Sequence, residues 1–215
     1  MNSELEEISI GREGLMNPLR YVLTFAIVIS AYDTGRAILS FIELMRLPEM
    51  DVLLVLLWLL TAPLSFAAVF FFFFSCKKLR EGRSAGMTIT IAFGLMILSS
   101  VSNLISQASI LNGNGLSIMI LCAIVLVCYI ICFLYYQRIG TKFLTYFAAA
   151  MNVLCGGYYL LNGIKLVIDE PDQLLGYLFT SYFTAFLVAV SVLLFVLTVD
   201  YGPVIEIVDE DETID

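Results

Sequence analysis

Histidine is absent from the sequence, and charged residues make up only 14% of its 215 positions. The absence of histidine removes the commonest metal ligand and the commonest general base in proteins. It excludes a serine–histidine hydrolase and a histidine-based zinc protease. The chain also lacks the GxSxG and GxxxxGK[ST] motifs, and no apolar segment carries a pair of carboxylates. We therefore expect that the protein is not an enzyme and holds no cofactor or metal ion.

The sequence has too few polar residues for a soluble domain. Hydrophobic residues make up 60% of the chain, and its mean hydropathy is +0.96, whereas soluble domains are about 45–50% apolar. The apolar residues gather in six segments, each near or beyond the ~20 residues that a helix needs to cross a bilayer. These segments are Pro18–Phe41, Asp51–Ser75, Ala85–Leu111, Leu116–Tyr136, Lys142–Ile168 and Leu174–Val199. We predict an all-α fold, a polytopic membrane helix bundle whose six transmembrane helices form three hairpins.

The residues outside these segments form short loops and two tails, which leaves no length for a second domain. We expect a cytoplasmic N-terminal tail over 1–17, a six-helix transmembrane domain over 18–200 and an acidic, disordered cytoplasmic tail over 201–215. The net charge is −8, and the last tail is rich in acids, which argues against binding to nucleic acid. The expected partners are the lipid bilayer and other membrane proteins or further copies of this chain.

Lysine and arginine predict the orientation of the segments, because cytoplasmic loops of membrane proteins are enriched in these residues. The basic residues that share one side are Arg12, Arg20, Lys77, Lys78, Arg80, Arg83, Arg138 and Lys142. The opposite side carries three basic residues at most, Arg46, Lys165 and the deeper Arg36. We therefore predict that both termini lie in the cytoplasm.

Three polar residues follow one face of the first segment. Asp33, Arg36 and Ser40 lie at positions i, i+3 and i+7, which places them on the same side of a helix. A charge in hydrocarbon costs at least ~2.5 kcal/mol, and pairing of Asp33 with Arg36 would lower that cost. Two interpretations stay open. The residues form an ion or solute site on an internal cavity, or the helix end lies among the lipid headgroups with Arg36 extended toward water.

Similar polar stripes occupy the outer halves of the third and fifth segments. Ser99 and Asn103 lie one turn apart in the third segment, and Asn152, Tyr159 and Asn162 share a face in the fifth. Around a pore these side chains would bind a polar solute. As an alternative they hold helices together, at about 0.6–2 kcal/mol for each hydrogen bond. We expect the first, third and fifth helices to adjoin one another around a shared interior.

Two functions follow from these patterns. The apolar second and fourth segments and the short loops favour a structural or accessory subunit of a membrane complex, which we place first. The polar outer halves of the first, third and fifth helices favour the alternative, a small channel or carrier for an ion or a small polar solute.

Overall fold

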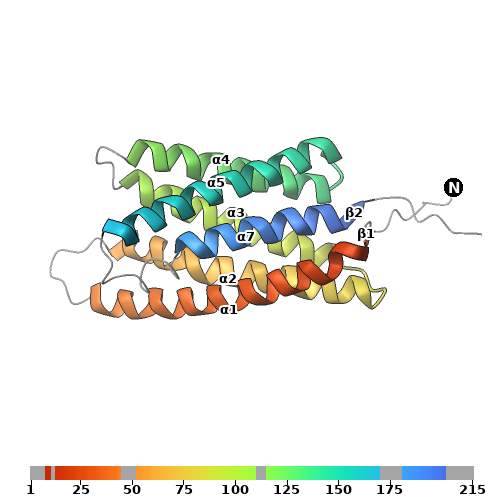
Figure 1. Ribbon diagram of the computed structural model, residues 1–215, viewed down its shortest axis with the longest axis horizontal. Helices are drawn as coiled ribbons and strands as arrows, with labels where there is room; N and C mark the ends of the chain where they lie inside the picture. Colours follow the sequence, from red (N-terminus) through yellow and green to blue (C-terminus); the bar gives the residue numbers. More distant parts are fainter. Residues whose placement is uncertain (1–7, 11–12, 45–51, 110–114, 170–180, 202–215) are drawn as a thin grey trace, which may run out of the picture.

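The structure is a computed structural model that describes residues 8–10, 13–44, 52–109, 115–169 and 181–201. Within these residues the chain forms six helices that run side by side along the long axis of the molecule (Figure 1). The elements are β1 (Ile8–Ile10), α1 (Glu13–Leu44), α2 (Val52–Arg80), α3 (Gly86–Ser109), α4 (Gly115–Tyr136), α5 (Lys142–Asp169), α7 (Ser181–Thr198) and β2 (Val199–Tyr201). The predicted all-α helix bundle is confirmed.

Five of the described helices, α1 to α5, are long and apolar enough to cross a membrane. The sixth, α7, is apolar as well but is described over 18 residues, because positions 174–180 of the predicted segment lie outside the described residues. α1 begins at Glu13, inside the predicted N-terminal tail and ahead of Pro18, where we expected the span to start. The predicted acidic tail beyond Tyr201 lies outside the described residues. The lengths and composition indicate an integral, multi-pass membrane protein.

The described helices form a closed ring in chain order. Each packs against the next, and α7 returns to pack against α1. The main contacts of α1, α3 and α5 are with α2, α4 and α7, not with one another, so the prediction that the odd helices adjoin is wrong. Short connections make consecutive helices antiparallel neighbours. In a ring of six helices, α1, α3 and α5 therefore alternate with α2, α4 and α7.

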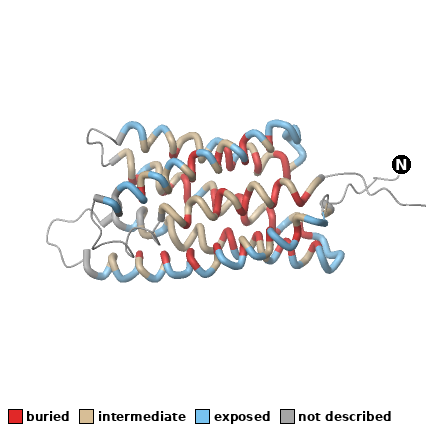
Figure 2. The backbone as a smooth tube through the Cα atoms, viewed as in Figure 1, coloured by how far each residue is buried: buried red, intermediate tan, exposed pale blue. Residues whose placement is uncertain are grey.

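The hydrophobic core lies in one half of the bundle along its long axis, and every described helix contributes to it. Figure 2 marks many of its buried positions in red, in the middle of the bundle and toward the end where β1 and β2 lie. At its centre are four aromatic side chains, from α2, α3, α4 and α7, which we call the aromatic layer: Phe72, Phe93, Tyr136 and Phe195. The ring centroid of Phe93 lies 4.9 Å from that of Phe72 and 5.4 Å from that of Tyr136. The layer fills the space between the helices at this depth.

The same end carries a polar closure beyond the aromatic layer. β1 and β2 pair as antiparallel strands, with Ile10 opposite Val199. The Tyr136 hydroxyl donates to the Val199 carbonyl at 2.9 Å, and the Tyr135 hydroxyl donates to the Asp200 carboxylate at 2.7 Å. Lys142 at the start of α5 forms an ion pair with Asp200. These contacts fasten the end of α7 to α4 and α5. A strand pair was not predicted, since β1 fell in the expected N-terminal tail.

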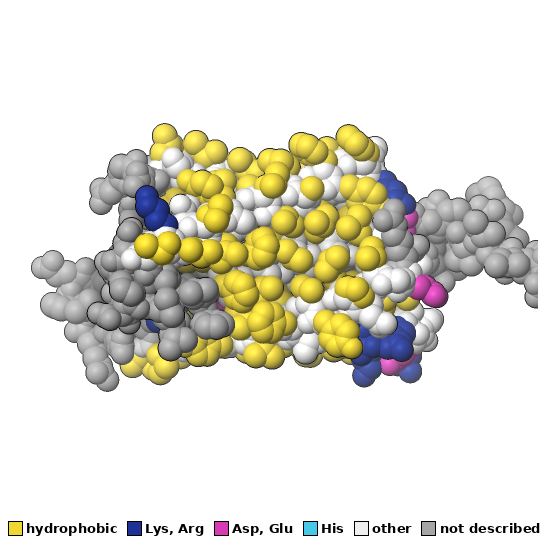
Figure 3. Space-filling model, viewed as in Figure 1, with side chains coloured by type: hydrophobic (Ala, Val, Ile, Leu, Met, Phe, Trp, Pro, Cys, Tyr) yellow, Lys and Arg dark blue, Asp and Glu magenta, His cyan; other side chains and the backbone are white. Residues whose placement is uncertain are grey.

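The outer surface suits a lipid environment. Large apolar side chains are exposed along the helices, for example Leu39 at 63% and Phe147 at 56%. On the face shown in Figure 3 they form a broad belt, and Lys and Arg side chains gather mainly at the end where the strands lie. We call this end the basic end. Exposed apolar area on such a scale is unusual for a soluble monomer, and it fits contact with lipid tails.

Candidate functional site

A cavity of about 840 Å³ occupies the half of the ring opposite the basic end, and each of the six described helices contributes to its wall. All the residues that the sequence analysis singled out lie on this wall: Asp33, Arg36, Ser40, Ser99, Asn103, Asn152, Tyr159 and Asn162. The polar faces of α1, α3 and α5 therefore do turn to a shared interior, although α2, α4 and α7 stand between these helices. The functional role of these residues stays a prediction.

The cavity extends from the middle of the ring toward the end away from the basic end, which we call the far end. Met96 lines its inner part, one turn along α3 from Phe93 of the aromatic layer. Gln107 and Ser117 also line it, two residues before α3 ends and two residues after α4 begins. The aromatic layer thus separates the cavity from the basic end.

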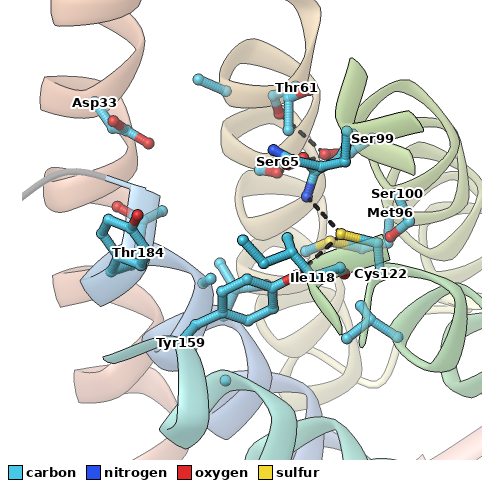
Figure 4. A pocket seen from close by; sticks show the side chains of 18 of the residues that line it. Asp33, Thr61, Ser65, Met96, Ser99, Ser100, Ile118, Cys122, Tyr159 and Thr184 are labelled. Atoms are coloured by element: carbon cyan, nitrogen blue, oxygen red, sulfur yellow. Dashed lines mark hydrogen bonds between the residues drawn. The ribbon is translucent and has the colours of Figure 1, made fainter. Parts of the chain in front are cut away.

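One part of the wall holds α2 and α3 together. The Ser99 hydroxyl donates to the backbone carbonyl of Thr61 at 3.0 Å and lies 2.8 Å from the hydroxyl of Ser65 (Figure 4). Because Ser99 has one hydrogen to donate, Ser65 is the donor in the second contact. Thr61 and Ser65 flank Pro63, which lies inside α2 and has no backbone N–H. Ser99 therefore packs helices and lines the cavity at once.

A second group of contacts joins α3, α4 and α5. The Asn103 side-chain nitrogen lies 3.5 Å from the Cys122 sulfur, which lies 2.9 Å from the Tyr159 hydroxyl. That hydroxyl also lies 3.4 Å from the backbone carbonyl of Ile118. These bonds are interhelical contacts of the kind that stabilise membrane bundles. The same side chains join helices and face the cavity, so the packing interpretation is supported by these contacts and a role in solute binding stays a prediction.

Other wall residues have no such partner. The Asn152 side-chain nitrogen and the Thr184 hydroxyl are buried and have no hydrogen-bond partner of normal geometry among the described residues. Asn152 is 2% exposed and Thr184 is 4% exposed, and both line the cavity. A buried polar group without a partner costs about 1–3 kcal/mol. We therefore expect water or a polar ligand to bind these groups inside the cavity.

Asp33 brings a negative charge to the same space. It is 8% exposed, and Arg36, three residues further along α1, is the positive charge that acts on it. Figure 4 shows Asp33 on α1 and Thr184 on α7, on the side of the cavity that faces Thr61, Ser65 and Ser99. Lys165 lines the cavity from α5, near the far end. The described wall thus carries charges of both signs.

The sequence analysis missed the cavity residues on α2, α4 and α7. Thr61 and Ser65 of α2, Cys122 of α4 and Thr184 of α7 all line the cavity. The second and fourth segments were interpreted as apolar, and no polar residue of the sixth was singled out. The polar residues beside Pro63 were a usable signal, because a proline inside a membrane helix frees backbone groups that need polar partners. Thr184 had no comparable signal in its apolar surroundings.

The described residues contain no group of three or more histidine, cysteine or acidic side chains that could hold a metal ion. The cavity wall instead offers hydroxyls, amides and three charged side chains. No protein family, curated protein or solved structure matches this chain. The wall can bind a small polar molecule through several hydrogen bonds and opposite charges.

Proposed function

We propose that the protein binds a small polar solute in this cavity and moves it across the membrane, as a channel or carrier. The observation that carries this proposal is the cavity itself, whose wall holds polar side chains from each of the six described helices. Its volume of about 840 Å³ lies within the ~300–1,000 Å³ of small-molecule sites. A bundle with a purely structural role would gain stability by filling this space with apolar side chains.

The buried polar groups on the wall support a wet or ligand-filled cavity. Asp33, Asn152 and Thr184 are all less than a tenth exposed, and in a dry apolar interior each would lose free energy. Polar residues inside membrane segments mark substrate and ion pathways in many transporters. The aromatic layer would then be the barrier between the cavity and the basic end, and transport would need that barrier to open.

The orientation is part of the proposal. Lys77, Lys78 and Arg80 lie at the end of α2, and Lys142 lies at the start of α5, all at the basic end. Because basic residues favour the cytoplasmic side, we infer that the cavity lies nearer the outer face. Green fluorescent protein fused after Asp215 should fluoresce in intact cells. An active periplasmic alkaline phosphatase fusion at the same point would contradict this orientation.

Filling the cavity should stop transport. Ser40 lines the cavity near the far end of α1, so Ser40→Trp would place an indole in the solute path. Uptake of a labelled mixture of amino acids, sugars and polyols into proteoliposomes should exceed that of empty liposomes. We expect Ser40→Trp to lower this uptake by about tenfold or more, because a pore-lining side chain sets the pore radius.

Leu39→Trp is the matched control for this experiment. Leu39 is the preceding residue and is 63% exposed on the outer surface, so its substitution should leave uptake unchanged. The thermal unfolding temperature of both variants in detergent shows whether either loses its fold. Uptake by the wild type that does not exceed the liposome background for any solute class would contradict the proposed function.

A further inference from the structure

We propose that the solute is a small zwitterion of amino-acid size, which carries an ammonium group and a carboxylate. This substrate class rests on the function proposed above and narrows it. The inference comes from the arrangement of acceptors and donors on the described wall. Asp33 offers only acceptor atoms when ionised, whereas the Asn152 side-chain nitrogen and Lys165 offer only donors.

The acceptor side of the cavity is Asp33 on α1 together with the Thr184 hydroxyl on α7 (Figure 4). α1 and α7 are neighbours in the ring. A carboxylate with little exposure gains most from a positively charged donor, because such hydrogen bonds are about twice as strong as neutral ones. An ammonium group on the solute is such a donor, and its other hydrogens are available to an unpartnered hydroxyl such as Thr184.

The donor side is formed by α5. Asn152 presents an N–H group beside the Tyr129 hydroxyl, with no partner of normal geometry in the described part of the chain. Lys165 presents an ammonium group further toward the far end. Arg36 also lines the cavity, but it lies on α1, three residues from the Asp33 carboxylate on which its charge acts. A carboxylate on the solute accepts from such groups, directly or through one ordered water. α7 stands between α1 and α5 in the ring, so a solute that reaches both sides lies across the cavity.

Solutes of other charge types fit this wall less well. An organic cation would suit Asp33 but would bring no acceptor charge to Lys165, and an anion would suit Lys165 but would bring no positive charge to Asp33. A sugar or polyol could bind Asn152 and Thr184 through hydrogen bonds but would bring no charge to the carboxylate. Only a zwitterion supplies both signs, which matches the charges of the wall.

The test is binding to purified full-length protein in detergent. A mixture of the twenty common amino acids is used first, by its effect on thermal unfolding, and the best single member is then titrated. Its methyl ester lacks the negative charge and its N-acetyl derivative lacks the positive charge, while glucose and glycerol are the neutral probes. We expect the amino acid to bind about tenfold or more tightly than either derivative, which corresponds to one lost charge-assisted contact.

Asp33→Asn assigns the acidic contact. It should weaken binding of the amino acid by about tenfold or more and strengthen, or leave unchanged, binding of the N-acetyl derivative, an anion that Asp33 repels. Glu81→Gln is the matched control, since Glu81 lies in the turn after α2 at the basic end and pairs with Arg83. Should Asp33→Asn not fold, Thr184→Val removes only a hydroxyl and should weaken the amino acid more than its N-acetyl derivative.

Two results would overturn the inference in different ways. Binding of glucose or glycerol that Asp33→Asn does not alter, without binding of any amino acid, would exclude the zwitterion and leave the solute path intact. Absence of binding by every probe, together with absence of uptake into proteoliposomes, would remove both the substrate class and the proposed function.

Discussion

Phe93→Ala should lower the free energy of unfolding by about 3–5 kcal/mol, the usual cost of removing a buried phenylalanine ring. Phe93 is 0% exposed and its ring contacts Phe72, Tyr136 and Phe195. Four helices, α2, α3, α4 and α7, meet at this side chain. The neighbouring side chains therefore cannot fill the space that it leaves unless whole helices move. Denaturant or thermal unfolding of the purified protein measures the loss.

The same substitution should also weaken the barrier below the cavity. Met96, one turn away on α3, lines the cavity, so loss of the Phe93 ring brings the cavity closer to the basic end. We expect liposomes with Phe93→Ala to leak small solutes that wild-type liposomes retain. Phe147→Ala is the control. Phe147 lies on α5 and is 56% exposed, so this substitution removes the same kind of ring from the outer surface. Equal stability and equal leakage of the two variants would show that the aromatic layer is neither core nor barrier.

The fold could be predicted from the sequence because long apolar segments identify membrane-spanning helices. α4 matches the predicted segment to within one residue, and α5 begins at Lys142 as predicted. In lipid each span must satisfy its own backbone, so hydropathy alone decides the secondary structure. The beginning of α1 was not accessible in this way, since Leu15 and Met16 stand among Glu13, Gly14 and Asn17, and so short a mixed stretch gives a weak hydropathy signal.

The arrangement of the helices depends on packing that composition does not encode. The predicted contact among α1, α3 and α5 is wrong because α7 fits between α1 and α5. A close approach makes this possible: a Cβ atom on Gly156 would lie 3.1 Å from the Cα of Phe186, and one on Gly163 would lie 3.0 Å from the Tyr182 ring. Small residues permit such contacts between membrane helices, but the sequence does not show which helix will occupy the space.

The cavity wall was predicted as far as polar periodicity reaches. Asp33, Arg36 and Ser40 share one face of α1 and were found for that reason, as was the stripe from Asn152 to Asn162 on α5. Periodicity does not show whether a polar side chain forms a hydrogen bond with another helix. Tyr159 does so with Cys122, whereas Asn152 has no partner of normal geometry among the described residues. The sequence does not reveal that difference, because it depends on how the helices are placed relative to one another.

Asp200→Asn should open the basic end. Asp200 accepts a hydrogen bond from Tyr135 and pairs with Lys142, and so fastens β2 to α4 and α5. The Lys142 side chain is 50% exposed, so the ion pair contributes at most about 1 kcal/mol, and the tyrosine bond adds about 1 kcal/mol. Asparagine keeps an oxygen that accepts from Tyr135, so mainly the ion pair is lost, and a loss of about 1 kcal/mol would raise the population of an open basic end by about fivefold.

Cys76 is the natural reporter of that opening. Its side chain is 1% exposed and lies one turn before the end of α2, on the basic side of the aromatic layer. With the other four cysteines replaced by alanine, we expect a charged thiol reagent to modify Cys76 about fivefold faster in Asp200→Asn than in the parent. Glu81→Gln breaks another ion pair at the same end, one confined to the turn after α2, and should leave the rate unchanged.

Equal Cys76 rates in the Asp200→Asn variant and the parent would mean that the strand pair and the aromatic layer close this end without Asp200. The opposite result has a consequence for transport. If the basic end opens when one polar contact is lost, the two ends of the ring differ in how firmly they are held. A solute that enters the cavity from the far end would then need only that contact and the aromatic layer to yield in order to leave at the basic end, which is the order of events that a carrier requires.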